Sequence, residues 1–145
     1  MSEVFESVDW DDPIPAPSQE EIAAVERVLG VQLPSDFIEF CRHYHGGFPD
    51  PDEIEVEGFG TTMVNSIIPF VDVPDERIRS IVSVVEAVEG LHHKLVPFAV
   101  EPGGNYFCFD YRSANQKVVF WFHEQSTIFD VCDSFTEFVE ILANA

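Results

Sequence analysis

Cysteine and histidine are the residues of this chain best suited to metal binding or nucleophilic catalysis. Cys41, His43 and His45 lie at alternate positions, and His92 and His93 are adjacent. A helix does not present residues i and i+2 on one face, and no C-x-x-C pair accompanies them, so we expect no structural zinc. Cys41 belongs to the apolar stripe of an expected helix, which is typical of a buried thiol and weakens any Cys–His nucleophile pair.

Carboxylates offer a second route to chemistry, because hard oxygen ligands bind calcium. Asp50, Asp52, Glu53 and Glu55 lie close together, but the D-x-[DN]-x-[DN]-G pattern of a calcium loop is missing and Pro51 restricts the backbone. The sequence also lacks a phosphate-binding loop ending in Lys-Ser or Lys-Thr, a G-x-S-x-G elbow and an H-E-x-x-H pair. We therefore expect no metal, no cofactor, no catalytic residue and no enzymatic activity.

The negative charge is unevenly distributed along the chain. The formal net charge is −20, from 27 acidic and 7 basic residues. No Lys or Arg occurs in residues 1–26 or 43–76, and each stretch holds eight acidic residues. An electronegative surface of this kind suits a basic partner and argues against direct binding to nucleic acid. The alternative is an acidic surface that serves only solubility or tolerance of high salt, and the 14 Phe residues weaken its high-salt form.

Length and composition predict one domain with a substantial core. The chain has 145 residues, of which 46% are hydrophobic and 13% aromatic. It opens on acidic residues without the features of a secretion signal, and no apolar run approaches the length of a membrane span. Three cysteines, an odd number in apolar surroundings, indicate reduced thiols. These features favour a cytoplasmic protein that has no membrane partner.

Residues 1–17 are expected to form an acidic, proline-rich arm, and residues 18–145 the folded domain. Proline removes hydrogen-bond donors and fixes φ, which favours an extended and weakly ordered backbone. Trp10 and Ile14 are the side chains with which this arm could contact the domain.

Four helices are predicted within that domain. Capping boxes at Ser18 and Ser134 open the first and the last helix. Pro34 fits the first turn of the second helix, and Pro74 that of the third.

The remaining segments predict strands. Ile54 and Val56 alternate with glutamates over residues 53–57, which indicates one buried face and a row of glutamates on the other. Short turns separate residues 95–100, 105–111 and 118–122, so antiparallel hairpins are the economical connection, and the apolar run 118–122 favours a central strand covered on both faces. The order of elements predicts a single α+β domain.

The ordered set of motifs resembles the SUKH superfamily, the bacterial immunity proteins related to fungal Smi/Knr-type cell-wall assembly regulators. The resemblance begins with Leu33-Pro34-Ser35-Asp36-Phe37 between two helices and with His45-Gly46-Gly47 at the end of the second. Segments 95–99, 105–110 and 134–138 are similar to the later landmarks of the superfamily in the same order, so the resemblance covers about residues 17–143. His45 is a departure, because the superfamily usually has Asn before the glycines.

The resemblance implies an α+β fold with a largely antiparallel or mixed sheet flanked by helices. It also implies a non-enzymatic role, in which the protein binds and neutralises a cognate bacterial toxin, often a nuclease. The superfamily supplies no catalytic residues to carry over and assigns no interface residue, because its partner-binding surfaces vary.

The leading hypothesis is therefore an immunity protein that covers a basic surface of a toxin domain. A regulatory scaffold that docks onto several proteins, like the fungal relatives, is the alternative, and a hydrolase or metal-dependent enzyme ranks third. The predicted partner-binding residues are all acidic: Asp50, Asp52, Glu53, Glu55 and Glu57, with Asp9, Asp11 and Asp12 as outer contributors.

Overall fold

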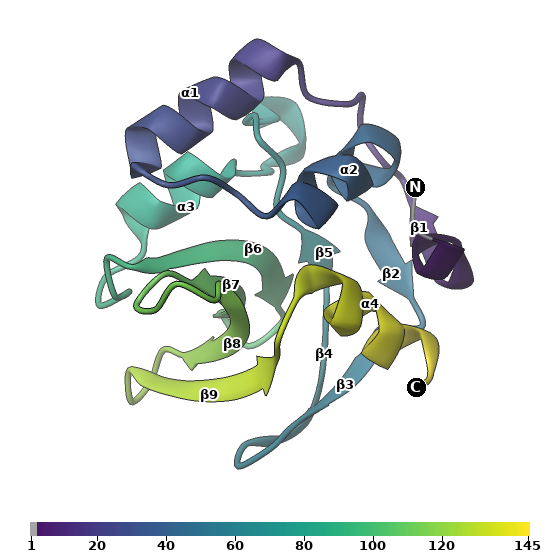
Figure 1. The fold of residues 1–145 in the computed structure, drawn as a ribbon, viewed down its shortest axis with the longest axis vertical. Helices are drawn as coiled ribbons and strands as arrows, with labels where there is room; N and C mark the ends of the chain where they lie inside the picture. The colour runs from purple at the N-terminus through teal and green to yellow at the C-terminus, as the bar shows by residue number, and fades with distance from the viewer. Residues whose placement is uncertain (1–2) are drawn as a thin grey trace.

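A five-stranded antiparallel sheet, with its strands in the order β5-β6-β7-β8-β9, forms the centre of the fold (Figure 1). The computed structural model describes residues 3–145. The sheet strands are β5 (Ser66–Ile67), β6 (Leu95–Glu101), β7 (Asn105–Asp110), β8 (Lys117–Phe122) and β9 (Thr127–Cys132). Two further antiparallel pairs join β1 (Asp9–Asp11) to β2 (Phe48–Asp50) and β3 (Glu53–Val56) to β4 (Gly60–Met63). The predicted α+β class and antiparallel sheet are confirmed.

Four α-helices flank these strands: α1 (Gln19–Leu29), α2 (Ser35–Tyr44), α3 (Ile81–Ala87) and α4 (Phe135–Ala143). The capping box of α1 is confirmed, since the Ser18 hydroxyl accepts from the Glu21 N–H and the Glu21 carboxylate accepts from the Ser18 N–H. At α4 only half of the box forms. Ser134 caps the Glu137 N–H, whereas the Glu137 carboxylate accepts from Asp133.

The third helix is shorter than the sequence predicted. Pro74 opens only a 3-10 turn, η2 (Pro74–Glu76), after which Arg77 takes a left-handed conformation with φ 57° and ends it. The helix begins at Ile81, where the Ser80 hydroxyl accepts from the Ser83 N–H. The prediction that Pro74 opens the third helix was wrong, because Ile78 forms an isolated antiparallel bridge with Val73 and so does not continue a helix from Pro74.

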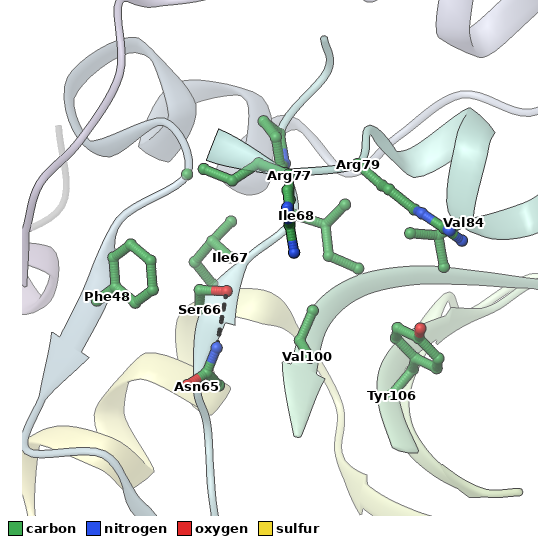
Figure 2. Close-up of a pocket in the computed structure, with 13 residues that line it drawn as sticks. Phe48, Asn65, Ser66, Ile67, Ile68, Arg77, Arg79, Val84, Val100 and Tyr106 are labelled. Atoms are coloured by element: carbon green, nitrogen blue, oxygen red, sulfur yellow. Dashed lines mark hydrogen bonds between the residues drawn. The ribbon is translucent and has the colours of Figure 1, made fainter. Parts of the chain in front are cut away.

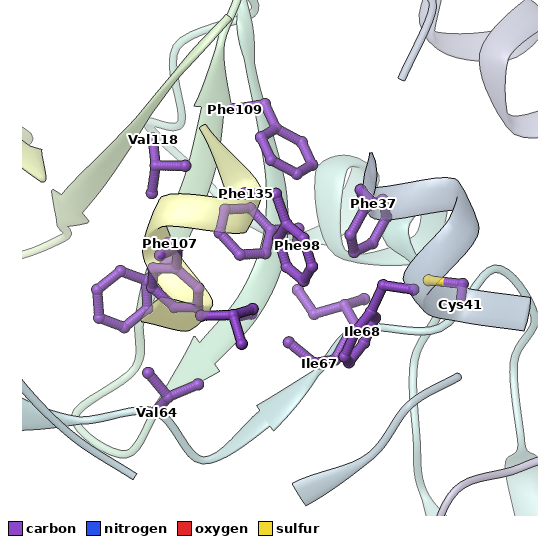
Figure 3. Packing of buried hydrophobic residues seen from close by; sticks show 14 of the residues in the cluster. Phe37, Cys41, Val64, Ile67, Ile68, Phe98, Phe107, Phe109, Val118 and Phe135 are labelled. Carbon is purple, nitrogen blue, oxygen red and sulfur yellow. The ribbon is translucent and has the colours of Figure 1, made fainter. Parts of the chain in front are cut away.

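Phenylalanine rings fill the core between the sheet and helices α2 and α4 (Figure 3). Phe37 on α2 lies 5.2 Å from Phe109 and 5.1 Å from Phe135 on α4, measured between ring centroids. Phe98 stacks on Phe109 at 4.3 Å. Each ring that is fully buried contributes roughly 1.5–3 kcal/mol of hydrophobic stabilisation. Aromatic packing therefore holds α2 and α4 against the sheet.

Strand β8 is covered on both faces, as its unbroken apolar run predicted. Val118 and Phe120 contact the aromatic core, and Val119 and Trp121 belong to a second cluster with Leu95 of β6. All four β8 side chains are at most 2% exposed.

Residues 3–17 pack against the rest of the chain. Phe5, in the 3-10 turn η1 (Glu3–Ser7), is 1% exposed, and Trp10 in β1 is 8% exposed. Trp10 packs closely on the backbone of Gly47, where a Cβ would lie only 3.1 Å from the Trp10 Cβ. The predicted boundary after residue 17 stays a prediction, and Met1 and Ser2 of the expected arm lie outside the described residues.

Candidate functional site

The β1–β2 ladder brings the two stretches without lysine or arginine together. Asp9 lies directly opposite Asp50, and Asp11 lies opposite Phe48. Trp10 turns inward between the two aspartates, so that Asp9 and Asp11 remain exposed. The sequence could not show this adjacency, and it makes the acidic residues of the N-terminal segment direct neighbours of the acidic middle of the chain.

Two of the three glutamates of the predicted row lie on β3, and Glu57 follows in the turn to β4. Ile54 and Val56 are buried, while Glu53, Glu55 and Glu57 are exposed. Glu53 and Glu55 stand opposite Met63 and Thr61 of β4, so the partner strand supplies no cation. The row is therefore a line of like charges that only solvent, ions or a partner can offset.

Further carboxylates border this row. A hollow between β3 and α4 is lined by Glu53 and Glu55 on one side and by Glu137 and Glu140 on the other. A second hollow, at the end of β3, brings Asp130 of β9 beside Glu55 and Glu57. We call the acidic face the set of Asp9, Asp11, Asp50, Asp52, Glu53, Glu55, Glu57, Asp130, Glu137 and Glu140.

No ion pair within residues 3–145 neutralises the acidic face. The ion pairs of the described chain join Glu39 to Arg42 and His43, and Asp110 to Arg112, and all of these residues lie outside the face. Two unit charges about 4 Å apart repel by roughly 1 kcal/mol in water and by more near a protein surface. Arg112 lies close enough to Asp130 for their charges to interact, but the rest of the acidic face is an uncompensated negative field, of a kind that attracts cationic surfaces.

Asp12 is the predicted site residue least connected to the others. It follows the end of β1 with a φ of 50°, and no side-chain hydrogen bond or ion pair within the described residues ties it to the face. Asp52 lies between β2 and β3 and is half-buried, and its carbonyl oxygen accepts from the Val64 N–H. The structure therefore places seven of the eight predicted residues on adjoining strands or the link between them and leaves Asp12 at the margin.

The histidines and cysteines do not assemble into a reaction centre. Within residues 3–145, no three His, Cys, Asp or Glu side chains are grouped as metal ligands would be. Cys41 is fully buried, and burial raises the pKa of its thiol well above the ordinary value. His43 approaches Glu39 at 3.7 Å, and His92 stacks on His93 at a centroid distance of 4.7 Å.

His45 has a structural role that the sequence did not reveal. Its Nδ1 lies 2.8 Å from the carbonyl oxygen of Pro15, and its Nε2 lies 2.8 Å from the backbone nitrogen of Phe70. Because a carbonyl only accepts and a backbone N–H only donates, the ring is neutral with its proton on Nδ1. Burial lowers the pKa of His45, although the hydrogen bond to Pro15 and the nearby Glu21 act in the opposite direction.

Comparison with known proteins identifies the family. The SMI1 / KNR4 family (SUKH-1) matches residues 16–141. The chain belongs to this family. It is also similar to an uncharacterised protein, YokK, derived from the SPbeta prophage of Bacillus subtilis strain 168, with 26% identity over 144 residues, 84% of this chain and 72% of YokK. Members of the SUKH superfamily are typically immunity proteins and generally lack catalytic activity. None of the helices in residues 3–145 is long and apolar enough to cross a membrane.

The first SUKH landmark builds the fold rather than the acidic face. Leu33 is 5% exposed, and Phe37 lies at the centre of the aromatic cluster. The Asp36 carboxylate accepts from the Phe37 N–H at the start of α2 and from both the N–H and the hydroxyl of Thr136 at the start of α4. These contacts explain why the landmark marks the family but gives no information about the partner.

Proposed function

We propose that this SUKH protein is an immunity protein that binds a basic bacterial toxin domain through the acidic face and blocks its activity. The observation that supports this most directly is the β1–β2 pairing, which places Asp9 and Asp11 of one base-free stretch beside Asp50 of the other. Strands β2 and β3 and helix α4 extend that surface on the same side of the molecule (Figure 1). A footprint of about 800 Å² per partner, typical of stable complexes, could cover many of these carboxylates.

The acidic face fits a role in rapid recognition. Exposed charge pairs contribute little to affinity, so the face acts chiefly on the rate of association. Electrostatic steering raises association rates by roughly ten- to a thousandfold at low salt, and the effect falls steeply with ionic strength. Fast capture is the useful property for a protein that must reach a toxin before the toxin reaches its target.

Charge reversal on the glutamate row tests this placement. Glu53, Glu55 and Glu57 are exchanged together for lysine, and a matched control exchanges the exposed Glu86, Glu89 and Glu124, which lie outside the face. The partner is first captured from the source cells on the immobilised protein, with washes at low and then at high salt. Association rates with that partner are then measured for both variants by surface plasmon resonance.

We expect the row variant to associate at least tenfold more slowly at low salt, and the control variant to lose only about twofold through its altered net charge. Both should melt within a few degrees of the parent protein. Equal rates for the two variants, or undiminished protection of cells that express the toxin, would contradict the use of this face. Weak recovery of several unrelated proteins would favour the scaffold function instead.

A further inference from the structure

Two of the seven basic residues of the chain border one small pocket whose lining includes none of the carboxylates of the acidic face (Figure 2). The pocket lies against β5 and holds a volume of about 290 Å³. Arg77 and Arg79 reach it from the segment between η2 and α3, and Tyr106 reaches it from β7. In a protein with a net charge of −20, this concentration of positive charge requires an explanation.

The two guanidinium groups are unengaged within the described part of the chain. No hydrogen bond or ion pair among residues 3–145 uses either of them. Asp72 is the nearest obvious partner for Arg79, but its Oδ1 accepts from the Ser80 N–H and from the Ser83 hydroxyl, both at 2.8 Å. Those hydrogen bonds are also the main reason for the lowered pKa of Asp72. Asp72 therefore holds Ser80 and Ser83 at the start of α3 and interacts with Arg79 only through its charge, without an ion pair.

The floor and the rim of the pocket differ in character. Ile67 and Ile68 are almost fully buried, and Val84 and Val100 complete the apolar wall. At the rim, the Asn65 side-chain amide donates to the Ser66 hydroxyl at 3.5 Å on the side of Arg77, whereas Arg79 lies beside Val84 (Figure 2). Arginine provides a planar fork of donors that matches carboxylate or phosphate oxygens. The site thus combines two arginine side chains at its rim with an apolar floor.

The surrounding charge selects between these anions. Asp72, Asp75 and Glu76 lie in the same segment as the two arginines, so the local sum is negative even with both cations present. A dianionic phosphate gains from two arginines but is repelled by three neighbouring carboxylates and by the field of the whole protein. A monoanionic carboxylate meets half of that repulsion and still fits the guanidinium fork.

We propose that this pocket binds a carboxylate attached to a short aliphatic group, with the carboxylate between Arg77 and Arg79 and the hydrocarbon against Ile67, Ile68 and Val100. A volume of about 290 Å³ is at the lower limit for small-ligand pockets, which restricts the ligand to a short chain. The carboxylate belongs either to a free acid or to the C-terminal residue of a peptide. This inference does not depend on the proposed toxin binding, because it concerns residues outside the acidic face.

The test is a titration of the 15N-labelled full chain with 4-methylpentanoate, followed by amide chemical shifts. We expect saturable shifts confined to Ser66, Ile67, Arg79, Val100 and their neighbours. The neutral isostere 4-methylpentanamide should bind at least tenfold more weakly, as should isobutylphosphonate in its dianionic form. A tetrapeptide that ends in leucine with a free carboxyl group carries the same chemistry. Whichever of the peptide and the free acid binds more tightly shows whether the natural ligand is a peptide C-terminus or a small acid.

Two variants complete the experiment. Arg77→Gln/Arg79→Gln should weaken binding at least tenfold, whereas Arg42→Gln, which removes an exposed arginine on α2, should leave it within twofold. Arg77 and Arg79 make no side-chain hydrogen bond or ion pair among residues 3–145, and Arg42 loses only an exposed ion pair with Glu39, so both variants should fold. The amide ligand tests the parent protein independently of any variant. Equal binding of acid and amide, equal effects of the two variants, or no saturation below about 10 mM would overturn the proposal.

Discussion

Replacing His45 by alanine should destabilise the protein by about 3 kcal/mol, because this ring connects two segments distant in the sequence. The exchange removes the acceptor of the Phe70 N–H, which is buried, and the donor to the Pro15 carbonyl, which is partly buried. An unsatisfied buried backbone group costs about 1–3 kcal/mol, so we assign roughly 2 kcal/mol to the first loss and roughly 1 to the second. In a domain of this size, the melting temperature should fall by roughly 6–12 °C.

The same side chain should make stability depend on pH. The pKa of His45 is lowered in the folded protein, so between that value and the ordinary value near 6.5 the unfolded chain binds more protons. The contribution of His45 is therefore fully present above about pH 6.5 and is lost as the pH falls, by at most about 1.4 kcal/mol per pH unit. His45→Ala should remove this component of the pH dependence.

Urea unfolding of both proteins at about pH 7.5 and about pH 5.5 measures these effects. The stability difference between parent and His45→Ala should be larger at the higher pH. His45→Gln serves as a control, since its amide retains one donor and one acceptor and should recover part of the loss. A stability difference that does not change with pH would refute the neutral, Nδ1-protonated role of His45, and a loss below about 1 kcal/mol would refute the bridging role itself.

Other contacts lead to four further expectations. Asp36→Ala should lower the free energy of unfolding by about 2 kcal/mol through the lost hydrogen bonds to α4, and Asp36→Asn should lower it less; equal losses in chemical denaturation would contradict this role. Phe37→Ala should cost about 3–5 kcal/mol by leaving a cavity at a fully buried position, which Phe37→Leu should largely avoid in the same assay. Asp50→Asn should raise stability by a few tenths of a kcal/mol at low salt by removing repulsion from Asp9, and this gain should vanish at high salt if it is electrostatic. Burial raises the pKa of Cys132 to about 12, so Ellman's reagent at about pH 8 should label it only after unfolding, and rapid labelling of the native protein would contradict its burial.

Local patterns predicted the parts of the fold that depend on local interactions. The capping box at Ser18, the alternation around Ile54 and the apolar run of β8 each correspond to the predicted element. Strand β9 was missed because none of Thr127 to Val131 is fully buried, which is typical of an edge strand and leaves no clear alternation. Segments β1 and β2 were missed because each has only three residues, and β2 contains Pro49.

The candidate site shows the same division. The glutamates of β3 follow from the period of a strand, so their common exposure could be predicted from the sequence. The position of Asp9 opposite Asp50 depends on a pairing across some forty residues, which no local pattern encodes. The Arg77–Arg79 pocket was missed for a related reason, since the predicted helix from Pro74 would have placed both residues on a helix surface rather than over β5.

The packing of Phe5 against Phe135 has a consequence for synthesis on the ribosome. Their ring centroids lie 5.8 Å apart although 130 positions separate them in the chain. At roughly 5–20 residues per second, translation needs about 7–26 seconds to supply the second ring after the first. Until α4 emerges, the aromatic core lacks one side and Phe5 has only Phe40, at a centroid distance of 5.4 Å, and not Phe135 to pack against. The nascent chain is therefore exposed to aggregation or chaperone binding for that interval. The carboxylates of α4, Glu137 and Glu140, therefore join the acidic face only after its other residues have been synthesised.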